Sequence, residues 1–283
     1  MLGLGPLRTK QLTERIRGFS DRSVYRCLRS LENYGLIERY EDSGLHSKVL
    51  LRLTEPLGRN LFRLLRHFEA TPWKEMRLLG ELWEAGVVDE LSRGPKSLME
   101  LLAAPHDLTY HQVKRRTGMA VDCGLLEGSS HKGNSRLYEL SDRGRHRMAL
   151  LADVGRWRHR YLVPGDAPGL ALEEMATILR AALPLVQLPA NAGMRVDLIV
   201  TGALEYGQRE VATVPGLVGR EGVVRFDPQP EREANGSASA TINTWFAALL
   251  DGHRGRIRVR GELGLVDRCM TQLHDSLWSG GPA

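Results

Sequence analysis

The chain has 283 residues, of which 42% are apolar and 26% charged, with a formal charge of +5 and a pI near 9.3. This mixture excludes a disordered chain and permits two or three separate hydrophobic cores. No apolar run reaches the roughly 18 residues that a membrane span requires, and the first residues lack the pattern of a signal peptide. We therefore expect a multidomain cytoplasmic protein, and the basic excess is compatible with a polyanionic partner.

Three cysteines, Cys27, Cys123 and Cys269, lie far apart in the sequence. Their odd number and wide spacing argue against a disulfide framework and against a zinc site. Each lies within an apolar pattern, so the sequence predicts three buried thiols and no metal or cofactor.

The first predicted unit begins with a short amphipathic helix at residues 10–16. Ser20 is placed to cap a second helix, whose apolar residues Val24, Leu28 and Leu31 follow helical spacing, and Gly35 ends that helix. Strands at residues 36–40 and 48–53 flank turn-forming residues and predict a hairpin, which a helix at residues 58–68 follows. Two helices followed by a two-stranded wing are typical of a winged helix.

The same order of elements returns after a constant shift of 89 positions. Gly5-Pro6 recurs as Gly94-Pro95 and Gly35-Leu36 as Gly124-Leu125. The second copy has predicted helices at residues 97–103, after Thr109 and at residues 144–161, with strands at residues 125–128 and 136–140. A unit of this length indicates a domain duplication, because solenoid repeats are much shorter.

The two copies differ at their start. A long helix predicted at residues 76–92 precedes the second copy, whereas the first copy has no room for such a helix before its Gly-Pro. Two explanations stay open: the chain is truncated, or another element, for example from a partner subunit, takes the place of that helix.

A turn-rich stretch at residues 163–169 indicates a domain boundary. The last third then alternates predicted helices and strands, which is typical of an α+β domain. The predicted domains are residues 1–71, 72–163 and 164–283. The predicted helices are residues 172–183, 244–250 and 263–277, and the predicted strands are residues 195–201, 210–214, 223–227, 239–242 and 256–260.

Residues 18–32 and 35–39, followed by Leu53-Thr54-Glu55 and Gly58, resemble the recognition-helix block of the HxlR family of bacterial winged-helix regulators. The second copy resembles this family more loosely, because Thr117 and Gly118 weaken the middle of its helix. The segment 238–277 resembles the end of sterol-carrier-protein type 2 domains, which are appended to some HxlR-type regulators and enclose an apolar tunnel. The fold class expected is therefore α+β, with two tandem winged helix-turn-helix domains and a sterol-carrier-like domain.

The predicted DNA contacts are the outward-facing side chains of the two recognition helices and the side chains of the wings. The alternative is a solvated basic face without a partner. The first copy contributes Arg22, Ser23, Tyr25, Arg26, Arg29, His46 and Lys48, and the second contributes His111, Gln112, Lys114, Arg115, His131, Lys132 and Arg136.

An apolar small molecule is the predicted ligand of the last domain, although an apolar helical stripe is often simply core. Candidate lining residues are Trp245, Phe246, Leu249, Met270, Leu273 and Trp278, with Trp157 at the junction.

Catalytic motifs are missing from the sequence, so an enzyme is the weaker hypothesis. The functional hypothesis is a ligand-responsive transcriptional regulator, expected to be a repressor, that binds a DNA operator alone or as a homodimer. The alternative is a carrier of a lipid-like molecule whose winged helices bind proteins.

Overall fold

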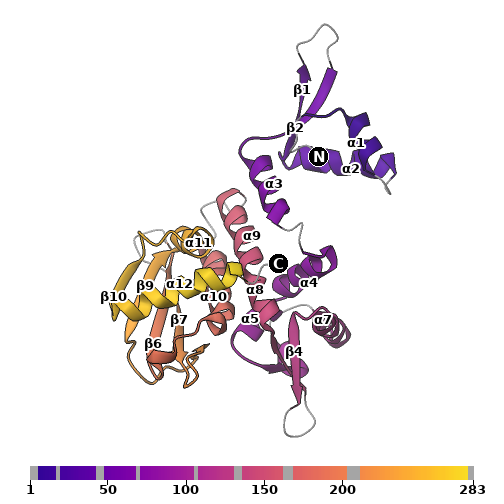
Figure 1. Ribbon diagram of the computed structural model, residues 1–283. Coiled ribbons are helices and arrows are strands. Elements are labelled where there is room, and N and C mark those ends of the chain that lie inside the picture. Colours follow the sequence, from indigo (N-terminus) through magenta and orange to yellow (C-terminus); the bar gives the residue numbers. More distant parts are fainter. Residues whose placement is uncertain are drawn as a thin grey trace. The chain divides into compact units, whose positions relative to one another are not determined.

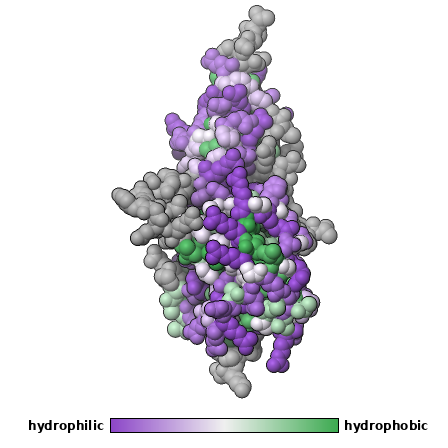
Figure 2. Space-filling model, turned by 90° about the vertical axis from the view of Figure 1, so that its left-hand side faces the viewer, coloured by the Kyte–Doolittle hydropathy of each residue, from purple (hydrophilic) through white to green (hydrophobic). Residues whose placement is uncertain are grey.

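The computed structural model describes residues 6–16, 20–42, 48–67, 71–104, 108–130, 136–161, 168–202 and 211–279. The chain divides into two compact units, residues 1–69 and residues 70–283 (Figure 1). Among the described residues, no helix is long and apolar enough to cross a membrane. On the face drawn in Figure 2, hydrophilic residues predominate and apolar residues gather in small patches.

The first unit, unit 1, has a small core between its helices and its hairpin. Leu12, Val24, Leu28, Ile37 and Leu51 are buried there. The strands pair in antiparallel register from Ile37 opposite Leu53 to Asp42 opposite Lys48. Its elements in order are α1 (Thr9–Arg15), α2 (Asp21–Asn33), β1 (Ile37–Asp42), β2 (Lys48–Leu53) and α3 (Leu57–His67).

One set of contacts joins the end of α2 to the start of α3. Gly35 has a φ of 66°, a left-handed conformation that glycine adopts without strain. The Thr54 hydroxyl donates to the Gly35 carbonyl at 2.5 Å and accepts from the Gly58 amide at 3.2 Å. A Cβ at Gly58 would collide with the carbonyl oxygen of Leu36, so only glycine fits there.

The second unit, unit 2, begins with two helices and a three-stranded sheet of order β3-β5-β4. The sequence predicted one helix over residues 76–92, and this was wrong. The helix breaks at Gly86, whose φ of 70° cannot continue an α-helix. The elements are α4 (Trp73–Glu84), α5 (Val87–Ser92), β3 (Lys96–Ser97), α6 (Leu98–Ala103), α7 (Tyr110–Asp122), β4 (Leu126–Ser130), β5 (Arg136–Leu140), α8 (Asp142–His146) and α9 (Met148–Tyr161).

Unit 2 repeats the contacts that join α2 to α3. Gly124 has a φ of 70°, and the Ser141 hydroxyl donates to its carbonyl at 2.6 Å. The same hydroxyl accepts from the Gly144 amide at 3.0 Å. A Cβ at Gly144 would collide with the Leu125 carbonyl oxygen. In both sets a hydroxyl donates to the carbonyl of the helix-ending glycine and accepts from a second glycine amide, and the elements around them follow the same order: α1, α2, β1, β2 and α3 in unit 1, and α6, α7, β4, β5 and α8 in unit 2.

The remainder of unit 2 is a five-stranded sheet of order β10-β9-β6-β7-β8, in which β6 and β9 are parallel and the other neighbours antiparallel. Val196, Leu198 and Val200 alternate along β6 and are buried, on the face that α10, α11 and α12 contact. The elements are α10 (Pro168–Ala182), two 3-10 turns (Leu183–Leu185 and Pro189–Asn191), β6 (Arg195–Thr201), β7 (Val211–Val218), β8 (Val224–Phe226), β9 (Gly236–Thr241), α11 (Ile242–Asp251), β10 (Arg258–Gly261) and α12 (Leu263–Ser279).

Several boundaries in this part differ from the sequence prediction, and two of the differences have a local cause. Ile242 was predicted to end a strand but begins α11, because the Thr241 hydroxyl accepts from the Thr244 amide and caps the helix. Pro168 and Gly169 were predicted in a linker but open α10, where proline suits a first helical turn.

A single hydrophobic core runs through unit 2 from Leu78 to Leu277. Helix α5 packs on α10, and α9 packs on α10 and α11. The domain boundary predicted between residues 163 and 164 stays a prediction. One hydrophobic core contains residues from both sides of it.

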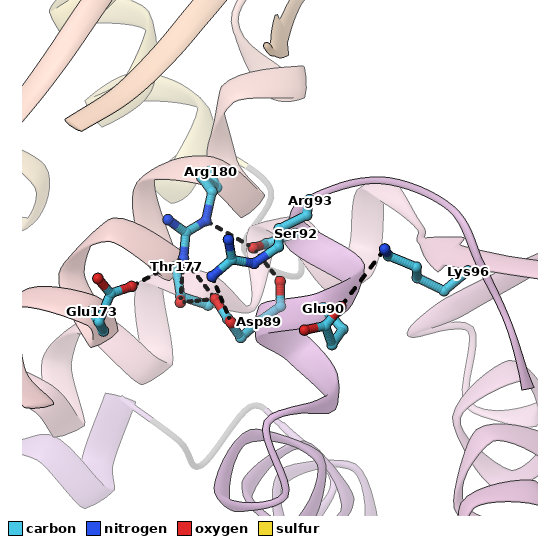
Figure 3. A network of polar contacts seen from close by, with 8 residues as sticks. All are labelled: Asp89, Glu90, Ser92, Arg93, Lys96, Glu173, Thr177 and Arg180. Atoms are coloured by element: carbon cyan, nitrogen blue, oxygen red, sulfur yellow. Dashed lines mark hydrogen bonds and ion pairs between the residues drawn. The ribbon is translucent and has the colours of Figure 1, made fainter. Parts of the chain in front are cut away.

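A buried polar network crosses the contact between α5 and α10 (Figure 3). The Arg180 guanidinium, 5% exposed, donates to Asp89 at 2.6 Å, to Thr177 at 3.0 Å and to Ser92 at 3.2 Å. Burial raises the pKa of the Asp89 carboxyl, but the hydrogen bond from Thr177 and the charge of Arg180 outweigh burial, so the pKa is lowered. Asp89 is therefore held as a carboxylate that locks α5 to α10.

Candidate nucleic-acid interface

Helix α2 presents a basic face because its apolar face is fixed in the core. Its N-terminus is capped by Ser20, which accepts from the Ser23 amide at 3.2 Å. Val24 and Leu28 are 6% exposed and face the core. The predicted contact residues Arg22, Tyr25, Arg26 and Arg29 are all exposed, whereas Ser23 is half-buried beside the cap.

The three arginines of α2 form no ion pair with any described residue, although paired arginines occur nearby. Arg52 lies 2.6 Å from Glu38, and Arg39 pairs with Glu32. Three unpaired guanidinium groups on one helical face can donate to phosphate oxygens or to guanine edges without first breaking a protein contact.

Helix α7 contacts the first strand of its hairpin, β4, as α2 contacts β1. Thr109 caps it, and the Gln112 side chain completes the cap by accepting from the Thr109 amide at 2.8 Å. Gln112 is exposed but its amide oxygen is occupied by this cap. His111, Lys114 and Arg115 are exposed, as the repeat predicted.

The wings are described in part. Among the predicted wing contacts, His46, His131 and Lys132 lie outside the described residues, as does the side chain of Lys48. Arg136 is exposed, and its guanidinium carbon lies 5.5 Å from the centre of the Tyr138 ring. The Arg136 side chain also crosses Gly128 closely enough that a Cβ there would collide with it. Arg136 therefore lies along the hairpin surface.

The candidate ligand residues of the last third lie in the core of unit 2. The Trp245 ring is fully buried and its indole nitrogen donates to the Ile199 carbonyl at 3.0 Å. Phe246, Leu249, Met270 and Leu273 are at most 4% exposed. The side chain of Trp278 lies outside the described residues. The structure thus brings five of the six predicted residues into one apolar core.

Trp157 lies half-buried on α9, with its ring centre 5.8 Å from that of Tyr161. Its indole N–H is buried without a hydrogen-bond partner among the described residues. One residue earlier, Arg156 lies 2.9 Å from both Asp153 and Asp251, which ties α9 to α11. Burial lowers the pKa of His159, whose ring faces Phe246. Trp157 therefore lies on α9, the helix that packs on α10 and α11.

Sequence reasoning missed two polar clusters. The first is Arg180 with Asp89; the second is Glu75, 3% exposed, which lies 2.6 Å from both Arg143 and Arg147. No local pattern marks these residues, because their partners are far apart in sequence. The thiol of Cys27 was predicted to be buried, and this was wrong: it is exposed, Cys123 is half-buried and Cys269 is buried. Among the described residues, no group of three or more potential ligands could hold a metal ion.

Two short consecutive helices, α1 and α2, followed by a hairpin and with an exposed basic face on α2, are the elements of a helix-turn-helix domain. Residues 1–76 match the family described as HxlR-like helix-turn-helix. Members of this family regulate transcription and are generally not enzymes, so the match indicates a DNA-binding transcription regulator. The match covers about a quarter of the chain. A search of curated proteins found no match.

Proposed function

We propose that the chain is a repressor with two winged helix-turn-helix domains, residues 1–71 and 72–163, that bind neighbouring segments of one DNA operator. The observation that carries this proposal is the repetition of the contacts around Gly35 and Gly124, together with an exposed basic face on both α2 and α7. The two domains would act within one chain or across a homodimer. The predicted contacts of α2, α7 and the wings are the proposed DNA-binding residues.

The proposed sensor is the segment 164–283, which resembles a sterol-carrier domain. An apolar ligand would enter among Trp245, Phe246 and their neighbours and change the packing against α9, where Trp157 lies. Such a ligand must favour one arrangement of the binding helices by a few kcal/mol to release DNA. A fluorescent fatty acid is a suitable first probe, and release of bound DNA on its addition is the expected result.

The test of DNA binding uses the full chain, its own upstream intergenic duplex and a scrambled duplex, followed by fluorescence anisotropy at several salt concentrations. Each phosphate contact contributes about 0.9 to the slope of log affinity against log salt. Arg26→Ala should weaken binding and, if Arg26 contacts a phosphate, lower the slope by about that amount. Arg59→Ala, which removes an exposed arginine paired with Glu55, is the matched control.

The outcomes distinguish a DNA-binding regulator from a carrier and test whether α2 is the binding helix. Selective, salt-dependent binding that Arg26→Ala weakens and Arg59→Ala does not would support the regulator. Weak binding without selectivity in the unmodified chain would refute it and favour the carrier. Unchanged affinity in Arg26→Ala would remove α2 as the binding helix.

A further inference from the structure

The two edges of the five-stranded sheet in unit 2 differ in what covers them. At one edge, β8 is bordered by the segment before it: the Val224 amide donates to the Val186 carbonyl at 3.1 Å, and the Leu188 amide donates to the Gly222 carbonyl at 2.7 Å. At the other edge, β10 pairs with β9 alone among the described residues (Figure 1). The outer edge of β10 therefore offers main-chain donors and acceptors to another extended chain.

The two faces of β10 carry different side chains. Val259 lies opposite Ala238, which is buried on the helix-covered face of the sheet. Arg258 and Arg260, the residues on either side of Val259, therefore project from the opposite face. Val259 is 38% exposed, and Leu263, just beyond the strand, is 64% exposed. The edge is thus basic on one face and apolar on the other.

The arginines of this edge have no acidic partner in the part of the chain that the structure describes. Arg258 and Arg260 of β10 are exposed and form no ion pair there, and the same holds for Arg256 in the turn before the strand. Arg254, by contrast, lies 3.0 Å from Asp267. Three guanidinium groups at the edge can therefore pair with an external anion without first breaking a protein contact.

This concentration of arginine is local. Residues 164–283 contain 11 arginines, no lysine and 14 acidic residues, so the segment as a whole is acidic. Four of the 11 arginines lie within residues 254–260. A basic stripe on an otherwise acidic segment gives the edge a charge complementary to an acidic partner.

Three kinds of occupant differ in how well they fit this edge. A second copy of β10 would bring Arg258 and Arg260 close to the same arginines, which repel one another. Single-stranded nucleic acid is held by aromatic stacking as well as by charge, and residues 252–264 contain no Phe, Tyr or Trp. An extended acidic peptide uses both the main-chain groups of the edge and its arginines.

We propose that β10 binds an extended segment of another protein, in which acidic and apolar residues alternate, by adding a sixth strand to the sheet. The acidic side chains of that segment lie beside Arg258 and Arg260, and its apolar side chains lie beside Val259 and Leu263. This inference concerns a protein partner of the C-terminal segment and depends neither on DNA binding nor on an apolar ligand.

Fluorescence anisotropy with the full chain tests the proposal, with a labelled hexapeptide of alternating glutamate and valine as the probe. A hexapeptide with its glutamates in one block and its valines in another has the same charge, so it is the control for attraction by charge alone. A contact with one short strand is weak, so the titration covers about 1 to 300 µM of protein. The alternating peptide should bind at least about tenfold more tightly than the block peptide, and equal or absent binding would overturn the proposal.

Two further peptides, N-methylated at either the odd or the even residues, separate strand addition from attraction between charges. Successive amides of a strand point to opposite edges, so only one of the two peptides is blocked at the edge that faces β10. That peptide should lose binding and the other should keep it, whereas equal binding of the two would overturn the proposal. This comparison needs no variant of the protein.

Charge reversal locates the contact on the protein. Arg258→Glu with Arg260→Glu should weaken binding of the alternating peptide by at least about tenfold. Arg220→Glu with Arg225→Glu makes the same change in net charge at exposed arginines near β8, the covered edge, and is the matched control. An equal effect of the two double variants would overturn the proposal. So would a single-stranded oligonucleotide that the first variant alone releases while the alternating peptide does not bind.

Discussion

Replacing Arg180 by methionine removes the guanidinium that joins α5 to α10 while keeping most of its apolar stem. Breaking a buried ion pair costs about 3 to 5 kcal/mol, but the Asp89 side chain is 33% exposed and water can solvate it after the change. We therefore expect a loss of about 2 to 3 kcal/mol in the free energy of unfolding of unit 2. For a unit of this size, that loss lowers the melting temperature by about 5 to 10 °C.

Differential scanning calorimetry of the full chain measures this change, and the chain supplies two controls. Arg93→Met removes a second arginine from the same carboxylate, but Arg93 is 41% exposed, so its loss should cost under about 1 kcal/mol. The melting temperature of unit 1 should not change, because the core of unit 1 is separate from that of unit 2. Equal melting temperatures of unit 2 in the two methionine variants would contradict this prediction, and so would an unchanged melting temperature in Arg180→Met.

Three further predictions concern single groups. Gly144→Ala should lower the free energy of unfolding by at least about 3 kcal/mol, measured by urea unfolding, because its Cβ would meet the Leu125 carbonyl. The control is Gly80→Ala, where a Cβ meets no atom within 4 Å, and a loss no larger than that of the control would contradict the clash. Burial raises the pKa of the Cys269 thiol to about 12, so this thiol should stay unlabelled near neutral pH until unit 2 unfolds, and labelling in the native state would refute its burial. Because the pKa of Asp89 is lower in the folded chain, its contribution to stability is present above the unfolded pKa of about 4 and is lost as pH falls through the folded pKa. Asp89→Asn should therefore flatten the acid side of the stability curve of unit 2, and an unchanged curve would contradict this.

Local patterns predicted the helices and hairpins well, because those elements depend on nearby residues. Ser20 and Thr109 are helix caps, and Gly35 and Gly124 end helices with left-handed conformations, as their positions indicated. Burial was harder to predict, because it depends on which elements pack against a helix. Cys27 follows the apolar pattern of α2, yet no described element of unit 1 covers it and its thiol is exposed.

The polar clusters were beyond sequence reasoning for a different reason. Arg180 and Asp89 are 91 residues apart, and neither lies in a motif. Their pairing depends on how α10 lies against α5, which periodicity does not encode. The exposed faces of α2 and α7 were predictable because burial of Val24 and Val113 fixes the rotation of each helix.

The continuous core of unit 2 limits how the chain can be divided in the laboratory. Met148 and Ala152 of α9 are fully buried, in a core that also holds Trp245 and Leu249 of α11. A fragment that stopped after α9 would expose this apolar surface to water and would tend to aggregate. The smallest piece that keeps α7 on an intact core is therefore residues 71–279, whereas unit 1 has its own core and can be produced separately.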